Sequence, residues 1–241
     1  VTWSLGEFAA AVEARLRAHG IVKGWVLAES FGSQVAWELL AGRGRGEGAG
    51  DGREVSGGMG ERVPRFRAEG LILAGGFARH PWLAGVRGTE WVLRRAPLGW
   101  LSAVVGGYAV VARWRFQQSA EVVAAVGEFR GRWGEELRQA AGHRLRLIAG
   151  NDPRELVRGV RVPVVHLTGV FDPVVPWWPV QRWLGRECPG WCGKAVVWPA
   201  DHNVLSTGTP AAVRLVLGWM GGAGRGAAGV SSSGTKAKSP P

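Results

Sequence analysis

Four short apolar runs with high β propensity recur along the chain, and segments with helical spacing separate them. The runs are GWVLA (24–28), GLILAGG (70–76), RVPVVHLTG (161–169) and KAVVWPA (194–200). Continuous apolar runs of this length are typical of strands that are buried on both faces. Strands that alternate with helices form parallel sheets with helices on their faces. The sequence therefore predicts an α/β fold with a mostly parallel sheet and helices on both faces.

The segments between these runs define the expected organisation of the chain. Apolar residues recur at helical spacing from Leu5 to Leu16, in a segment that ends at Gly20. Further helices are expected at 31–41, 176–185 and 210–220, and residues from 80 to about 145 are expected to be mainly helical. We expect one domain over residues 1–220. It is interrupted by a disordered Gly- and Arg-rich insertion at 42–67 and followed by a disordered low-complexity tail at 221–241.

Composition excludes some classes of function. The chain of 241 residues is 46% hydrophobic, and it has neither an uncharged apolar run long enough to span a membrane nor a signal peptide. We therefore expect a cytoplasmic protein without a membrane span. The net charge of +11 comes largely from arginine, which supplies 26 of the 30 basic residues. These arginines are scattered and not interleaved with aromatic residues, so no specific nucleic-acid partner is expected.

The two cysteines, Cys188 and Cys192, lie close together in RECPGWCGK. A lone pair at this spacing is not a metal site without further ligands. We expect two free thiols near a loop, although a disulfide is compatible with the spacing.

Ser30 stands between the first predicted strand and the helix that follows it. Such a turn is cramped, and the small residues Ala28 and Gly32 on either side suit it. The turn would push the serine oxygen outward at a helix N-terminus, where the Phe31 backbone N–H and the helix dipole favour a developing oxyanion. The alternative is that Ser30 only caps the helix.

Two further polar residues follow the third and fourth strands. Asp172 lies in TGVFDPVVP, and His202 lies in PADHNVL. Taken singly, they are a turn aspartate before a proline and a surface histidine. Taken with Ser30, they supply a nucleophile, a base to remove its proton, and an acid to orient that base. Ligands of parallel sheets bind beyond the carboxyl ends of the strands, which is where all three residues are expected.

At these segments the chain resembles the α/β-hydrolase family. LAESFG (27–32) is similar to the nucleophile elbow of the family, HLTGVFDPVVP (166–176) to its acid segment, and VVWPADHNVL (196–205) to its histidine loop. The resemblance covers residues 1–220 apart from 42–67. It implies a catalytic triad of Ser30, Asp172 and His202, and a helical lid at about 80–145.

The chain departs from the family pattern in three places. Ala28 and Asp201 stand where glycine is usual before the serine and before the histidine. The chain also starts at the helix just ahead of the nucleophile strand. By the resemblance, it lacks the N-terminal half of the fold and the loop that donates a second oxyanion N–H. We therefore expect the sequence to be part of a longer hydrolase.

The function implied is that of a serine hydrolase of the carboxylesterase type, which acts on a small-molecule ester through an acyl-enzyme and needs no metal or organic cofactor. Two alternatives stay open. One is an acyltransferase or C–C hydrolase on the same scaffold. The other is a non-catalytic binding protein or an inactive fragment.

Other polar residues are weaker candidates for a site. The lone histidines His80, His143 and His166 have no nucleophile or acid placed near them in the sequence, although His80 could line a pocket. Asp152 is expected in a loop ahead of the third strand. Asp201 adjoins His202 in the chain, which makes it an unsuitable partner for that imidazole.

Overall fold

The computed structural model describes residues 2–42, 66–115, 127–128 and 131–222. Nearly all of the expected insertion and tail therefore lie outside the described residues. The strands are β1 (Lys23–Glu29), β2 (Arg67–Ala74), β3 (Val164–Gly169) and β4 (Trp191–Val197). The helices are α1 (Leu5–Ala18), α2 (Gly32–Ala41), α3 (Leu83–Arg95), α4 (Leu98–Arg115), α6 (Glu135–Gly150), α7 (Arg154–Gly159), α8 (Trp177–Glu187), α9 (Val204–Thr207) and α10 (Thr209–Gly221).

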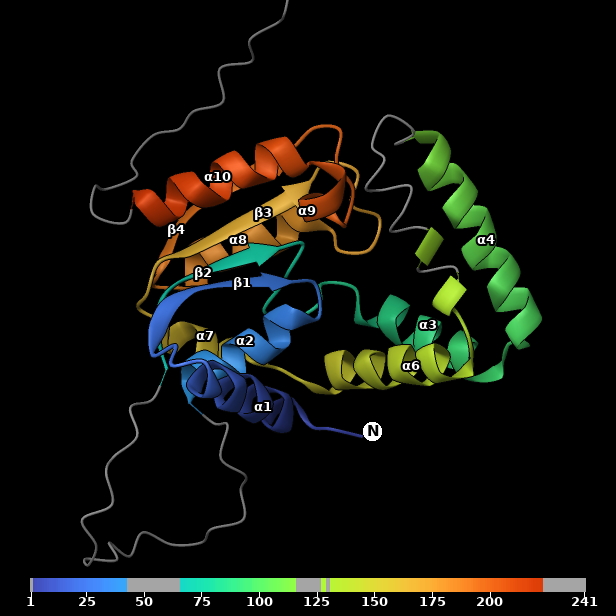
Figure 1. Cartoon of the computed structure of the whole chain (residues 1–241), viewed down its shortest axis with the longest axis horizontal. Helices are drawn as coiled ribbons and strands as arrows, with labels where there is room; N and C mark the ends of the chain where they lie inside the picture. The colour runs from blue at the N-terminus through green and yellow to red at the C-terminus, as the bar shows by residue number, and fades with distance from the viewer. Residues whose placement is uncertain (1, 43–65, 116–126, 129–130, 223–241) are drawn as a thin grey trace, which may run out of the picture.

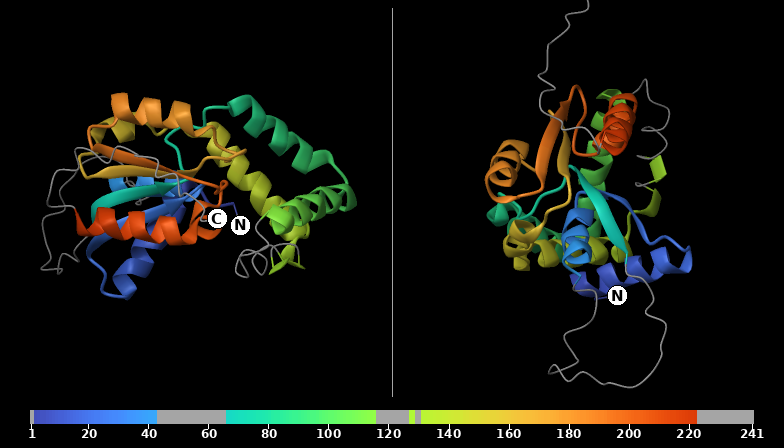
Figure 2. Two further views of the ribbon diagram at one scale, coloured as in Figure 1. Left: turned by 90° about the horizontal axis from the view of Figure 1, so that it is seen from above. Right: turned by 90° about the vertical axis from the view of Figure 1, so that its left-hand side faces the viewer.

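The strands form one parallel sheet in the order β1-β2-β3-β4, which is also their order in the chain. Because each crossover moves to the next strand in the same direction, right-handed connections place the connecting helices on one face. The buried cluster on that face joins β1–β3 to α2, α7 and α8. A second cluster on the opposite face is built from α9 and α10. The sheet thus lies between α8 and α10 (Figure 2), and the predicted α/β fold is confirmed.

Helices α3, α4 and α6 lie beyond the carboxyl ends of the strands, at one side of the molecule (Figure 1). Helices α3 and α6 pack against each other, whereas α4 exposes apolar residues to solvent. The largest of these are Trp100, Val104, Tyr108, Val110, Val111 and Trp114. The segment is helical where it is described, as expected, and its role as a lid stays a prediction.

Local chemistry accounts for the ends of several elements. Helix α1 begins with a capping box, because the Ser4 hydroxyl accepts from the Glu7 N–H and the Glu7 carboxylate accepts from the Ser4 N–H. Helix α2 ends at Gly42, whose φ of 75° is the left-handed conformation that favours glycine. The register of β1 and β2 pairs Trp25 with Gly70, and a Cβ at Gly70 would lie 2.4 Å from the Trp25 ring. A larger residue at position 70 would therefore force that indole to move.

Some predicted bounds were wrong. The fourth strand, expected at 194–200, is β4 and begins three residues earlier at Trp191. It ends before Pro199, which has no N–H to continue the ladder. The second strand begins at Arg67, inside the predicted insertion, and the short helices α7 and α9 were not predicted. The short polar segments of these two helices give no clear periodicity.

Candidate active site

Ser30 occupies a sharp turn between β1 and α2. Its φ is 50°, a left-handed conformation that is rare for residues with a side chain. The neighbouring backbone holds it there, since the Ser30 N–H donates to the Ala74 carbonyl at 2.9 Å. The Ser33 hydroxyl donates to the Ser30 carbonyl at 2.7 Å and accepts from the Phe77 N–H at 3.1 Å. The turn is therefore locked to the segment that follows β2, which is how such strain persists in a folded protein.

Asp172 follows β3, and both of its carboxylate oxygens have partners. One oxygen, Oδ1, accepts from the backbone N–H groups of Val174 and Val175, at 2.9 and 2.8 Å. The other, Oδ2, lies 2.8 Å from His202 Nδ1. The side chain of Asp172 has no exposed area, and that of His202 is 12% exposed. The turn after β3 thus aims the carboxylate at the imidazole.

His202 joins the two ends of this chain of hydrogen bonds. A carboxylate can only accept, so the proton between His202 and Asp172 lies on Nδ1. In the neutral ring Nε2 is then an acceptor, and it lies 2.8 Å from the Ser30 hydroxyl oxygen. The structure therefore brings the three residues that the sequence singled out into one chain of hydrogen-bonding distances, an arrangement in which a neutral His202 can take the serine proton.

Two glycines make room for the loop that carries His202. Gly75 has a φ of 57°, and a Cβ there would lie 2.9 Å from the His202 carbonyl and 3.2 Å from its ring. A Cβ at Gly169, the last residue of β3, would lie 2.2 Å from the Asp201 carbonyl oxygen. Neither glycine was predicted to belong to the site. The Gly-Gly pair after the apolar run of β2 was the available signal.

Phe31 lies directly after Ser30, at the N-cap position of α2. Its backbone N–H therefore belongs to the first turn, where amide groups have no partner within the helix. The expectation that the cramped turn needs a small residue at Gly32 was wrong, because no atom of the described structure lies within 4 Å of a Cβ placed there. Ala28, in contrast, is buried, as the cramped turn predicts.

His80 supports the turn that holds Asp172. It is buried, and its Nε2 lies 3.2 Å from the Val174 carbonyl, while its Nδ1 accepts from the Trp82 N–H at 3.1 Å. Burial lowers the pKa of His80, so its neutral form is favoured. Val174 thus bonds to Asp172 through its N–H and to His80 through its carbonyl. Sequence reasoning placed His80 near a pocket but did not foresee this contact.

His166 is a buried histidine of β3. Its Nε2–H donates to the Gly76 carbonyl at 3.0 Å, and its Nδ1 accepts from the Gln181 amide at 3.1 Å. Burial lowers its pKa to about 4, which favours the neutral ring. It is a structural link between β3, the segment after β2 and α8.

The remaining polar candidates do not bond to Ser30, Asp172 or His202 within the described structure. Asp201 accepts from the Asn203 N–H and the Thr207 hydroxyl, so its carboxylate is held by the segment of α9. Asp152 pairs with arginines, and His143 Nε2 lies 2.7 Å from the Trp3 carbonyl.

The part of the chain that the structure describes has neither a cluster of metal ligands nor a membrane-spanning helix. No group of three or more His, Cys, Asp or Glu side chains gathers there as a possible metal site. No helix there is long and apolar enough to cross a membrane. Cys188 and Cys192 are both free thiols, as predicted.

The sequence matches no family model and no curated protein. Solved structures do match. A hydrolase from Pseudomonas aeruginosa PA01 has a TM-score of 0.66 at 18% identity, with 92% of this chain and 73% of that chain covered. The chain has the α/β-hydrolase fold.

Other structures with the α/β-hydrolase fold match equally well. The enol-lactonase from Burkholderia xenovorans LB400 has a TM-score of 0.65 at 16% identity, with 91% of this chain and 74% of that chain covered. An esterase from Exiguobacterium antarcticum has a TM-score of 0.65 at 10% identity, with 92% of this chain and 75% of that chain covered. At these identities the likeness establishes the α/β-hydrolase fold, and the chemistry has to be argued from the site.

Proposed function

We propose that this protein is a serine hydrolase that cleaves a carboxylic ester through an acyl-enzyme, with Ser30, His202 and Asp172 as its triad. The observation that carries the proposal is the continuous chain of hydrogen bonds from the Ser30 hydroxyl through His202 to Asp172. The hydrolases and esterases among the structural neighbours support the same class of reaction.

In the first half of the reaction, Ser30 Oγ attacks the ester carbonyl while His202 Nε2 removes the serine proton. Asp172 keeps the ring oriented and stabilises the imidazolium that forms. The Phe31 N–H, at the start of α2, donates to the oxyanion of the tetrahedral intermediate. The intermediate collapses when His202 gives its proton to the leaving alcohol, which leaves an ester on Ser30.

The second half repeats these steps with water as the nucleophile. His202 removes a proton from the water, which attacks the acyl-enzyme carbonyl, and the same N–H stabilises the second oxyanion. Collapse releases the acid and returns the proton to Ser30 Oγ. An activated serine is therefore the chemical property that the proposal requires.

Labelling with a fluorophosphonate probe tests for that property without knowledge of the natural substrate. We expect the protein to be labelled and Ser30→Ala to be unlabelled. Ser102→Ala is the matched control, because that exposed serine lies on α4 and bonds only to the Leu98 carbonyl of its own helix. Circular dichroism establishes that each variant is folded. A folded wild-type protein that takes up no probe would overturn the proposal.

A further inference from the structure

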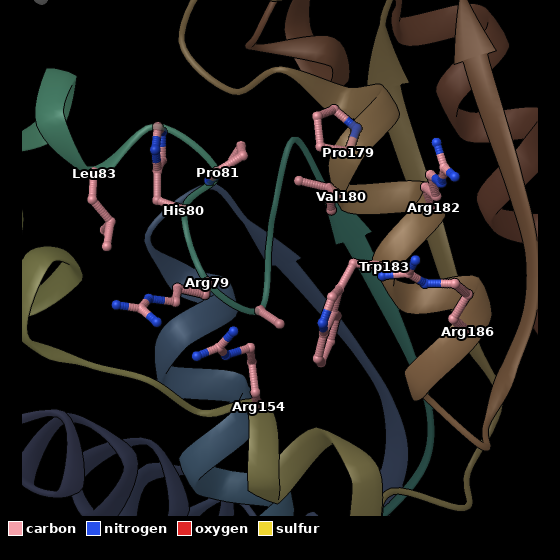
Figure 3. A pocket seen from close by; sticks show the side chains of 11 residues that line it. Arg79, His80, Pro81, Leu83, Arg154, Pro179, Val180, Arg182, Trp183 and Arg186 are labelled. Atoms are coloured by element: carbon pink, nitrogen blue, oxygen red, sulfur yellow. The ribbon is translucent and has the colours of Figure 1, made fainter.

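A cavity of about 480 Å³ is lined by an unusual number of arginines. Its walls come from the segment after β2, the start of α7, and α8 (Figure 3). The lining residues are Ala78, Arg79, His80, Pro81, Leu83, Arg154, Pro179, Val180, Arg182, Trp183 and Arg186. Ser30, Asp172 and His202 are not among them, so this is a separate site, which we call the arginine cavity.

One wall of the arginine cavity holds two arginines that share a single carboxylate. Arg154 donates to both oxygens of Asp152, at 2.7 and 2.6 Å, and Arg79 Nη1 donates to Asp152 Oδ2 at 2.9 Å. The hydrogen bonds from Arg154 are the main reason that the pKa of Asp152 is lowered, so its carboxyl stays ionised at neutral pH. One carboxylate cannot neutralise two guanidinium groups. Arg79 Nε is also buried and has no hydrogen-bond partner.

The opposite wall is the face of α8 that carries Arg182, Trp183 and Arg186 (Figure 3). Arg182 and Arg186 are exposed, and the structure records no ion pair for either within the described residues. They are four positions apart on one helix, an arrangement in which like charges repel. Nearby Glu155 and Glu187 do not compensate them, because both pair with Arg158.

The arginine cavity therefore combines four guanidinium groups and one carboxylate with apolar surface from residues such as Leu83, Pro179 and Trp183. Guanidinium groups suit phosphate because they donate several hydrogen bonds in a plane and remain charged at neutral pH. The volume lies within the range of sites for small molecules. A ligand with a single carboxylate would leave most of the positive charge of these arginines unmatched, whereas a phosphate group carries more negative charge.

We infer that the arginine cavity binds a phosphorylated small molecule, with its phosphate groups between Arg79 and Arg154 on one wall and Arg182 and Arg186 on the other. The organic part of the ligand lies against Trp183 and Pro179. None of the triad residues lines this binding site, so the inference does not rest on the proposed ester hydrolysis.

Isothermal titration calorimetry with pyrophosphate at low ionic strength tests the inference. We expect saturable binding of one pyrophosphate, and we expect acetate at the same concentration to bind at least tenfold more weakly. Arg182→Gln/Arg186→Gln should weaken pyrophosphate binding at least tenfold. Arg87→Gln/Arg214→Gln removes the same charge from exposed positions on α3 and α10, and it should weaken binding less than twofold. Ser30→Ala should bind like the wild type, which separates this test from that of the proposed function.

A second measurement needs no variant. Phenylglyoxal modifies accessible arginines, and peptide mass spectrometry reports which ones react. Pyrophosphate should protect Arg182 and Arg186 at least fivefold and leave Arg87 and Arg214 unprotected. Absence of saturable pyrophosphate binding, equal weakening in the two double variants, or uniform protection of all four arginines would each overturn the inference.

Discussion

At the scale of single residues, the two ring nitrogens of His202 have partners of different kinds. Nδ1 faces the buried carboxylate of Asp172, and Nε2 faces the Ser30 hydroxyl. The neighbouring Asp201 directs its carboxylate away, to the Asn203 N–H and the Thr207 hydroxyl. Two aspartates thus lie close to one histidine, and only one of them can set its tautomer.

Substitution of each aspartate in turn tests which carboxylate orients the His202 ring. Asp172→Asn should lower kcat for an ester substrate by a factor on the order of 10³–10⁴, because an amide that donates to Nδ1 favours the wrong tautomer. Asp201→Asn should lower kcat less than tenfold, since an asparagine can still accept from Asn203 and Thr207. Steady-state kinetics with a chromogenic ester measures both. A larger loss of kcat in Asp201→Asn than in Asp172→Asn would show that Asp172 is not the acid that orients His202.

The meeting of Ser30, Asp172 and His202 could be predicted because each follows an apolar run, and the runs are visible in the sequence. The contacts that hold these three residues in place could not be predicted from the sequence. That Val174 bonds to Asp172 on one side and to His80 on the other depends on how the turn after β3 folds, and no local spacing encodes it. The same holds for Gly75, whose lack of a side chain matters only because His202 comes to lie beside it.

At the scale of elements, the carboxyl end of β3 fixes the position of the loop after β4. A Cβ at Gly169 would lie 2.2 Å from the Asp201 carbonyl oxygen and 2.3 Å from that of Ala200. Both atoms belong to backbone, which cannot swing aside as the end of a side chain can. The close approach of β3 to this loop therefore requires glycine.

Gly169→Ala should displace the loop, with a loss of about 3 kcal/mol in the free energy of unfolding. It should also lower kcat by roughly 10²-fold, because small misplacements of catalytic groups are costly. Gly193→Ala is the control in β4, where a Cβ would meet only a Val165 methyl at 3.8 Å. Urea denaturation and ester kinetics measure the two effects. Equal behaviour of the two variants would contradict this account.

The elements themselves were predicted to different degrees. Apolar runs located all four described strands, although only β3 is buried along its whole length and the outer strands β1 and β4 are partly exposed. Their ends were predicted less accurately, as β4 shows, since Trp191 joins the ladder by pairing with Val164 of β3 and not by any pattern of its own. The order of strands is likewise a property of pairing, which no single segment specifies.

At the scale of the whole molecule, the buried ring of His166 couples stability to pH. Its pKa is lowered by burial to about 4, below the ordinary value of 6.5. Between these two values, the unfolded chain binds a proton at this histidine and the folded protein does not. The free energy of unfolding therefore rises with pH in this interval and falls as the solution is acidified through it.

We expect His166 to remove about 3 kcal/mol of stability between pH 6.5 and pH 4 and to have no effect on the slope above pH 7. Urea denaturation of the wild type and of His166→Gln at pH 7.5 and 4.5 measures this difference. The variant should be less stable at pH 7.5, because it loses the ring between Gly76 and Gln181, and it should lose less on acidification. Parallel pH profiles for the two proteins would exclude this linkage.

The distance along the chain between Ser30 and His202 has a consequence for synthesis. The two residues are 172 positions apart, and Asp172 lies 30 positions before His202. A chain made from its N-terminus therefore contains Ser30 long before it contains His202. A ribosome that stops between these two residues releases a polypeptide in which Ser30 lacks the histidine proposed as its base.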